Sequence, residues 1–152
     1  MATGTRRSLT RVLAFWDTSA LVPLFLRQSS TQLVMKLYKV HNVVVWWSTP
    51  VEIASAAARL LRIGQISTDD FAKARRLAKE FFASWSVVAP SDAVRATAIR
   101  LVERYDLRAA ESLQLAAALQ WCEDAPQGRI FLTGDRKLHD AALLSGFDTR
   151  QI

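Results

Sequence analysis

The chain has few of the residues that form disulfides, zinc sites and membrane spans. Its 152 residues include one cysteine and two histidines. A lone cysteine, Cys122, excludes an intrachain disulfide and fits a reducing compartment, so we expect a cytoplasmic protein. Neither histidine has a partner at the spacing of a zinc site. No apolar run approaches the roughly 18 residues that a membrane span needs, so we expect no membrane partner.

The sequence also lacks the signs of several domains. It contains no internal repeat, no low-complexity segment and no linker. Arg6, Arg7 and Arg11 near the start precede no long apolar segment, which is not the pattern of a signal peptide. A length of 152 residues suits one domain with a sizeable core. We therefore predict a flexible tail at residues 1–9 and a single domain at residues 10–152.

The charge is biased toward lysine and arginine. Twenty basic residues against 14 acidic residues give a formal net charge of +6. Such a balance fits a polyanionic partner such as RNA or DNA. It fits equally well a basic surface that only keeps the protein soluble, so charge alone does not identify a partner.

Short, continuously apolar segments alternate with segments of helical periodicity. The apolar segments predict strands at residues 11–16, 43–47, 85–88, 130–133 and 147–152. Helices are predicted at residues 19–26, 31–39, 50–63, 68–83, 91–105, 107–122 and 137–144, the third with Thr49 as its N-cap. This alternation is typical of an α/β domain whose parallel sheet is covered on both faces.

Two aspartates follow predicted strands directly. Asp17 ends the segment AFWD, and Asp135 follows FLTG. Ligands of open α/β sheets bind outside the carboxyl ends of the strands, which is where both carboxylates should lie. The alternative role of each is to cap the next helix, although Thr18 or Ser19 could take that role in place of Asp17.

Two glutamates lie on predicted helices. Glu52 stands three residues after Thr49, a spacing that also predicts a capping box. Glu111 and Gln114 fall within the apolar arc of the helix at residues 107–122. An ionised carboxylate on a packing face is unfavourable unless it binds a metal or pairs with a cation, and Arg108 is the alternative partner of Glu111.

If the four acids meet in space, either some of them take up protons or a cation neutralises their charge. Oxygen-only ligands suit a hard divalent ion such as Mg²⁺, which also binds phosphate oxygens. An acidic pocket on a basic protein then predicts metal-assisted cleavage of a phosphodiester, with the basic surface holding the nucleic acid backbone.

The motifs DTSAL, VE, LRAAESLQLAAAL and TGDRKL occur in order over nearly the whole chain. Together they resemble the PIN-domain ribonucleases, and most closely the VapC-type toxins of toxin–antitoxin pairs. The resemblance implies a Rossmann-like three-layer α/β/α fold with a short, mostly parallel central sheet. It also implies an endoribonuclease dependent on Mg²⁺ or Mn²⁺. The positions that match the acidic ligands of the family are Asp17, Glu52, Glu111 and Asp135, and those that match its supporting hydroxyls are Thr18 and Thr133.

The resemblance further implies a homodimer held inactive by a VapB-like antitoxin. The chain departs from the family at Glu111, where Asp is more frequent, and at Gly134, where a bulkier residue is common. Trp16 and the pair Trp46 and Trp47 are also unusual. We expect Trp16 and one of the pair in the core. The other could stack on a base, although the core is the favoured place for it as well.

The RNA substrate would be single-stranded or structured, with transfer, ribosomal and messenger RNA all open. Basic residues placed to contact its phosphates are Arg108, Arg136 and Lys137 near the acids, and Lys73 and Arg76 on the helix at residues 68–83. The main alternative is a non-catalytic RNA-binding module on a PIN-like fold. A haloacid-dehalogenase-type phosphatase is disfavoured, because Ser19 stands where that chemistry needs a second aspartate. A DNA-directed nuclease is disfavoured by the small size of the chain.

Overall fold

A computed structural model describes residues 11–152, so the tail predicted at residues 1–9 lies outside the described residues. The fold is built on one five-stranded sheet in the order β3-β2-β1-β4-β5, and every neighbouring pair of strands is parallel. The strands are β1 (Val12–Trp16), β2 (His41–Trp46), β3 (Ser86–Val88), β4 (Ile130–Thr133) and β5 (Asp148–Gln151). All five match strands that the sequence predicts.

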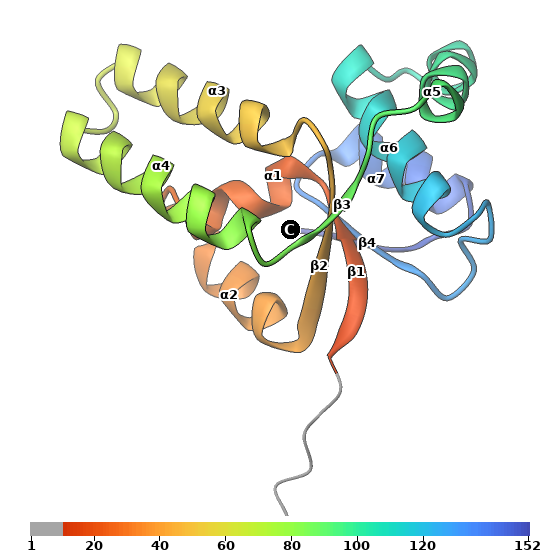
Figure 1. Ribbon diagram of the computed structural model, residues 1–152, viewed down its shortest axis with the longest axis horizontal. Coiled ribbons are helices and arrows are strands. Elements are labelled where there is room, and N and C mark those ends of the chain that lie inside the picture. The colour runs from red at the N-terminus through yellow and green to blue at the C-terminus, as the bar shows by residue number, and fades with distance from the viewer. Residues whose placement is uncertain (1–10) are drawn as a thin grey trace, which may run out of the picture.

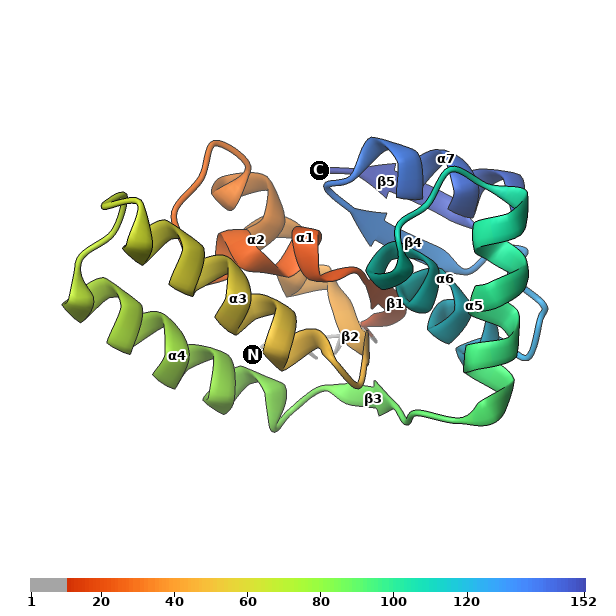
Figure 2. The same cartoon turned by 90° about the horizontal axis from the view of Figure 1, so that it is seen from above.

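Helices cover both faces of the sheet (Figures 1 and 2). The α-helices are α1 (Thr18–Leu21), α2 (Thr31–Val40), α3 (Thr49–Arg62), α4 (Thr68–Phe82), α5 (Asp92–Arg104), α6 (Ala109–Trp121) and α7 (Arg136–Leu144), and a 3₁₀ turn, η1 (Val22–Leu24), follows α1. None of the helices within residues 11–152 has both the length and the apolar composition that crossing a membrane requires.

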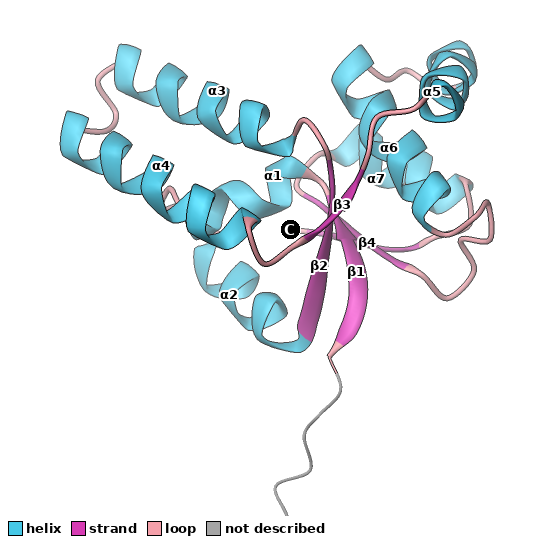
Figure 3. Cartoon of the chain, in the orientation of Figure 1, coloured by secondary structure: helices cyan, strands magenta, loops and turns pink. Residues whose placement is uncertain are grey.

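The core forms two layers, because successive strand residues point to opposite faces of the sheet. Phe15 and Phe131 face α5, α6 and α7, and their rings stack at 5.4 Å between centroids. Trp16 and Leu132, the next residue on each strand, face α1 to α4. The result is the three-layer α/β/α arrangement that the sequence predicts (Figure 3).

Helices α3 and α4 form a hairpin that extends away from the sheet (Figure 1). Gly64, with a positive φ of 71°, ends α3 as the sequence predicts. Ser67 and Asp70 form a capping box at the start of α4. The expectation for the start of α3 was wrong: Ser48, not Thr49, is the N-cap, and Thr49 is the first helical residue, buried with no partner for its hydroxyl among the described residues.

Strand β1 lies at the centre of the sheet, between β2 and β4. Trp16 at its end is in register with Leu132, and the amide of Asp17 donates to the carbonyl of Leu132 at 2.9 Å. The carboxyl ends of the central strands therefore lie side by side. Side chains that follow β1 and β4 directly, and those at the start of α3 just after β2, come together at this edge.

Candidate metal site at the carboxyl edge of the sheet

Asp17 is the most buried acid at this edge, with 5% of its surface exposed. It is the N-cap of α1, so the idea that Thr18 or Ser19 would cap this helix was wrong. Its Oδ2 atom accepts from the Ser19 amide at 3.2 Å, from the Ser19 hydroxyl, and from the Thr133 hydroxyl at 3.0 Å. None of the hydrogen bonds made within residues 11–152 ends on Oδ1, so this oxygen keeps its capacity to bind a ligand.

Burial raises the pKa of Asp17 from 3.8 to about 6. The negative charge of nearby Glu52 also raises it, while the hydrogen bonds from Ser19 and Thr133 act in the opposite direction. The charged form of Asp17 therefore lacks solvation and has a like charge beside it. A cation bound here would relieve both effects.

Glu52 reaches the same region from the first turn of α3. The Ser48 hydroxyl donates to its Oε1 at 2.7 Å. The amide of Gln114, on α6, donates from Nε2 to Oε1 and Oε2 of Glu52 at 3.1 and 3.2 Å, and to the Thr18 hydroxyl at 3.0 Å. Neutral donors thus hold the Glu52 carboxylate, so its charge is not cancelled.

Asp135 stands at the end of β4 and caps α7, since its Oδ1 accepts from the Leu138 amide at 2.8 Å. Thr133 ties it to Asp17: the Thr133 hydroxyl accepts from the Asp135 amide at 3.0 Å and donates to Asp17. The Gly134 amide donates to the Ser19 hydroxyl at 2.8 Å. The turn that carries Asp135 is therefore hydrogen-bonded to the first turn of α1.

Glu111 has the alternative partner that the sequence left open. Its Oε2 accepts from the Arg108 amide at 2.8 Å, and its Oε1 pairs with Nε of Arg108 at 3.2 Å. Together these contacts form a box at the start of α6. The first turn of α6 is only partly covered, so an exposed arginine reaches the carboxylate. The Thr133 hydroxyl joins Asp17 to the backbone of Asp135, and Gln114 joins Glu52 to Thr18, the residue after Asp17. Glu111, one turn before Gln114, has no hydrogen bond to any of these groups among the described residues.

The acids do not form a dense cluster. Within residues 11–152 there is no place where three or more His, Cys, Asp or Glu side chains converge closely enough to hold a metal ion. Mg²⁺ does not need such a cage, because it commonly binds one or two carboxylates and completes its shell with water and substrate phosphate. The pair Asp17 and Glu52 fits that requirement.

The basic residues expected to bind RNA lie on the surface. Lys137 pairs with Asp106, and Arg108 pairs with Glu111, although both cations remain largely exposed. Arg136 is exposed at the start of α7. Lys73 and Arg76 are exposed on α4, remote in sequence from the acids. Arg108 is the N-cap of α6, the helix of Glu111, and Arg136 and Lys137 are the first residues of α7, which Asp135 caps. Lys73 and Arg76 belong to the protruding hairpin.

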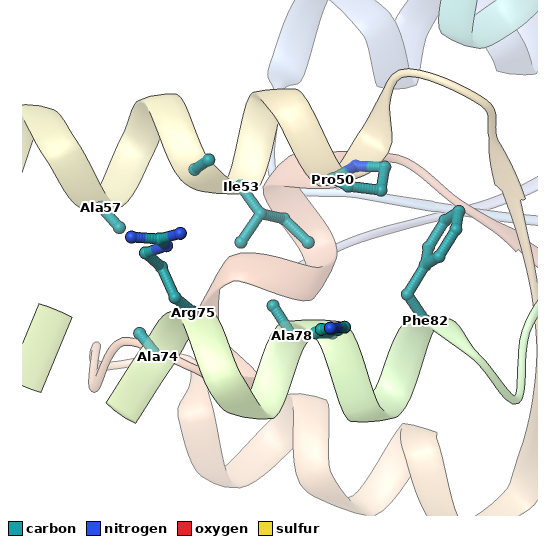
Figure 4. Close-up of a pocket in the computed structure, with 9 residues that line it drawn as sticks. Pro50, Ile53, Ala57, Ala74, Arg75, Ala78 and Phe82 are labelled. Atoms are coloured by element: carbon teal, nitrogen blue, oxygen red, sulfur yellow. The ribbon is translucent and has the colours of Figure 1, made fainter. Parts of the chain in front are cut away.

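An apolar groove lies between α3 and α4 (Figure 4), and none of the four candidate acids lines it. It encloses about 360 Å³. Its walls are Pro50, Ile53, Ala54, Ala57, Ala74, Ala78 and Phe82, with the side chains of Arg75 and Lys79 beside them. The groove offers an apolar floor with positive charge at its side, and it contains no acidic residue that could hold a metal.

Sequence reasoning missed the roles of three side chains. Ser19 joins Asp17 to Thr133 and Gly134, Ser48 supports Glu52, and Gln114 joins Glu52 to Thr18. Only Gln114 carried a signal, because a polar residue inside an apolar arc needs a buried partner. Trp16 and one of the pair, Trp46, are buried as expected. The expectation that the core also takes the other member was wrong, because Trp47 is 56% exposed.

No family model matches the sequence. No curated protein matches it either. Several solved structures are similar to the chain in fold. A chain of the toxin–antitoxin complex from Klebsiella pneumoniae aligns with a TM-score of 0.59 at 14% identity, over 82% of this chain and 88% of that one. PAE2754 from Pyrobaculum aerophilum aligns with a TM-score of 0.59 at 21% identity, over 91% and 89% of the two chains.

FitAcB from Neisseria gonorrhoeae aligns with a TM-score of 0.62 at 15% identity, over 90% of this chain and 97% of that one. Identities this low establish a shared architecture and not a shared activity. The chain adopts the PIN-like three-layer α/β/α fold that its motifs predict, with a sheet that is parallel throughout.

Proposed function

We propose that the protein is a metal-dependent endoribonuclease that acts as the toxin of a toxin–antitoxin pair of VapC type. The observation that carries the proposal is Asp17, a buried carboxylate at the carboxyl end of the central strand with Oδ1 uncommitted and Glu52 nearby. A buried acid beside a second, partly covered acid is unfavourable by itself, and a bound divalent cation would offset both charges.

The residues present fit Mg²⁺ or Mn²⁺. Their donor atoms are hard carboxylate oxygens, and in this proposal Asp17 and Glu52 hold the ion while Asp135 faces it from the same edge. When bound, such an ion activates water and stabilises negative charge on the leaving oxygen of a phosphodiester. Ser19 and Thr133 orient Asp17, and Ser48 orients Glu52. Glu111, the remaining acid of the family pattern, would contact the ion only after its ion pair with Arg108 breaks.

The substrate in this proposal is RNA, bound through its phosphates. Arg136 is exposed directly after Asp135, and Arg108 and Lys137 lie at the starts of α6 and α7. Each cation is close in sequence to an acid of the proposed site, so a backbone held by them would pass over the carboxyl edge of the sheet. Lys73 and Arg76 on the protruding hairpin would contact RNA farther from the cut.

The proposed regulator is a VapB-like antitoxin, and a homodimer and a cytoplasmic location complete the proposal. Support comes from the structural neighbours, one of which is a toxin–antitoxin complex. In this proposal a segment of the antitoxin lies against the toxin, and the groove between α3 and α4 has the size and apolar lining to take its side chains. Arg75 and Lys79 beside it would favour an acidic one.

A non-catalytic RNA-binding module is the second candidate, and one observation favours it. Glu111 is paired with Arg108, and no three metal-binding side chains converge within the described part of the chain. A module of this kind would bind RNA in the complete absence of divalent metal and would leave it intact.

The test is cleavage of total cellular RNA by the purified protein, free of antitoxin, with Mg²⁺, with Mn²⁺ or with EDTA. We expect discrete fragments with metal only, and none from Asp17→Asn. Asp140→Asn, which neutralises an exposed acid on α7, is the matched control and should cleave like the wild type. Intact RNA with the folded wild-type protein and metal, together with RNA binding that survives EDTA, would establish the binding module instead.

A further inference from the structure

Gln114 is the most deeply buried amide at the candidate site, with 1% of its surface exposed in the middle of α6. Its Nε2 atom approaches Oε1 and Oε2 of Glu52 at 3.1 and 3.2 Å and Oγ1 of Thr18 at 3.0 Å. The amide cannot be turned round, because its oxygen would then face both oxygens of the Glu52 carboxylate. One NH₂ group therefore spans the two elements that carry Glu52 and Thr18.

The other end of the same amide is unsatisfied. Oε1 of Gln114 is buried and has no hydrogen-bond partner within residues 11–152. Leaving a buried acceptor unpaired is unfavourable. Methionine or leucine would fill this part of the core without that loss, so packing does not explain glutamine at this position. The contact with Glu52 and Thr18 does explain it.

The chemical type of the donor also matters. Lysine or arginine at position 114 could hold the Glu52 carboxylate, but the positive charge would cancel the negative charge that attracts a metal ion. An apolar residue would leave the Glu52 carboxylate held by the Ser48 hydroxyl alone, on one of its two oxygens. A buried neutral amide fixes the direction of the carboxylate and preserves its charge, which is the task of the groups that orient metal ligands.

Thr18 extends the effect to the other carboxylate. It directly follows Asp17, so the bond from Gln114 to Thr18 anchors the loop that presents Asp17, while the bonds to Glu52 anchor α3. The same side chain thus sets the separation of the two acids. Glu111 lies one turn earlier on α6 and reaches Arg108 instead, so α6 contributes to the site through Gln114.

We infer that Gln114 is a positioning residue for the metal site: its amide fixes Glu52 relative to Asp17 so that both carboxylates can bind one divalent cation. The inference rests on the proposed function, because it requires that the site takes a metal. A purely structural role differs from it in one measurable way. A structural tie between α6, α3 and the Asp17 loop affects the free energy of unfolding, whereas a positioning residue affects metal affinity in the folded protein.

The experiment is a titration of metal-free protein with Mn²⁺, with free Mn²⁺ measured by electron paramagnetic resonance. Four variants accompany the wild type. Gln114→Met removes the donor at similar volume, and Gln114→Lys keeps a donor but adds charge. Gln120→Met makes the same replacement at an exposed position of α6, and Asp17→Asn removes a proposed ligand. Circular dichroism and thermal unfolding in EDTA establish that each variant is folded.

We expect Gln114→Met to raise the Kd for Mn²⁺ roughly tenfold or more, the usual effect of losing a group that orients a ligand. Gln114→Lys should raise it further, and its ion pair with Glu52 should preserve the fold even if the methionine variant unfolds. Gln120→Met should bind like the wild type. If the folded Gln114 variants bind Mn²⁺ like the wild type while Asp17→Asn does not, the inference is wrong and the proposed function stands. If the wild type neither binds Mn²⁺ nor cleaves RNA, both are wrong.

Discussion

Replacing Asp17 by asparagine should stabilise the metal-free protein at neutral pH, although it should abolish cleavage. Burial and Glu52 raise the pKa of Asp17 from 3.8 to about 6, a difference of about two units. At about 1.4 kcal/mol per unit, the ionised carboxylate in the folded state is disfavoured by about 3 kcal/mol. Asparagine removes this penalty and keeps an oxygen for the Ser19 and Thr133 hydroxyls. The pKa of about 6 already includes the hydrogen bonds from Ser19 and Thr133, and because the NH₂ group of asparagine is a new donor at a buried position, we expect a net gain of about 1–3 kcal/mol.

The gain in stability of Asp17→Asn over the wild type should increase as the pH rises. Between pH 3.8 and about 6 the folded state binds more protons at Asp17 than the unfolded state, so the wild-type protein loses stability as the pH rises through this window. Above it the penalty is constant, and below it the penalty is absent. The variant should therefore exceed the wild type at pH 7.5 and match it near pH 4.

Urea unfolding in EDTA at both pH values measures the difference, with Asp140→Asn as the control for a simple loss of negative charge. Thermal unfolding should show the same order, by about 2–4 °C for each kcal/mol in a chain of this size. Adding Mg²⁺ at pH 7.5 should stabilise the wild type and not the variant, because only the wild type retains the ligand. A variant that is less stable than the wild type at pH 7.5 would refute the argument from burial and repulsion.

Three further outcomes follow from the site and its surroundings. Glu111→Gln should keep the free energy of unfolding, because glutamine can also close the box at the start of α6, whereas Glu111→Ala should lose about 1 kcal/mol in urea unfolding. Glu111→Gln should also keep its Mn²⁺ affinity, and a loss of Mn²⁺ binding would instead make Glu111 a ligand. Trp47→Ala should leave the free energy of unfolding nearly unchanged, since the ring is 56% exposed, but weaken binding of single-stranded RNA by about 1–3 kcal/mol in a fluorescence anisotropy titration if the ring stacks on a base. Affinity for Mn²⁺ should fall as the pH drops below about 6, where protons compete for Asp17, and a flat profile from pH 5 to 7.5 would exclude Asp17 as a ligand.

The sequence predicts the fold well because its strands are buried on both sides. Segments such as VVVWW and IFLT are continuously apolar, and only a sheet covered on both faces explains several of them in one short chain. The positions of Asp17 and Asp135 follow from the same reasoning, since a residue just after a parallel strand lies at the carboxyl edge wherever the strand falls in the sheet. Periodicity and strand ends are local properties, and local properties can be read from sequence.

The partners of each acid could not be read in this way. Side-chain rotamers within one helical turn decide whether Glu111 pairs with Arg108 and whether Ser48 bonds to Glu52. Thr49 and Ser48 are both good caps by residue type, and the Ser48 side chain makes no capping bond to the helix backbone, so the start of α3 could not be chosen from residue type. The contact of Gln114 with Thr18 joins residues 96 positions apart, which no local pattern encodes.

The acids of the described chain differ in the charge of the groups that they contact, and this difference is more informative than their positions in the sequence. Asp92, Asp106 and Glu111 each pair with a cation, so their charges are already balanced. Asp17 and Glu52 are held by neutral hydroxyl and amide groups, and Asp135 by a backbone amide, so their charges are oriented but not balanced. Maintaining uncancelled charge at a covered edge opposes folding, and such an arrangement persists when function requires the charge. A divalent cation is the ligand that this pattern of partners would attract, and it would be drawn to Asp17 and Glu52 rather than to the acids that already have a cation.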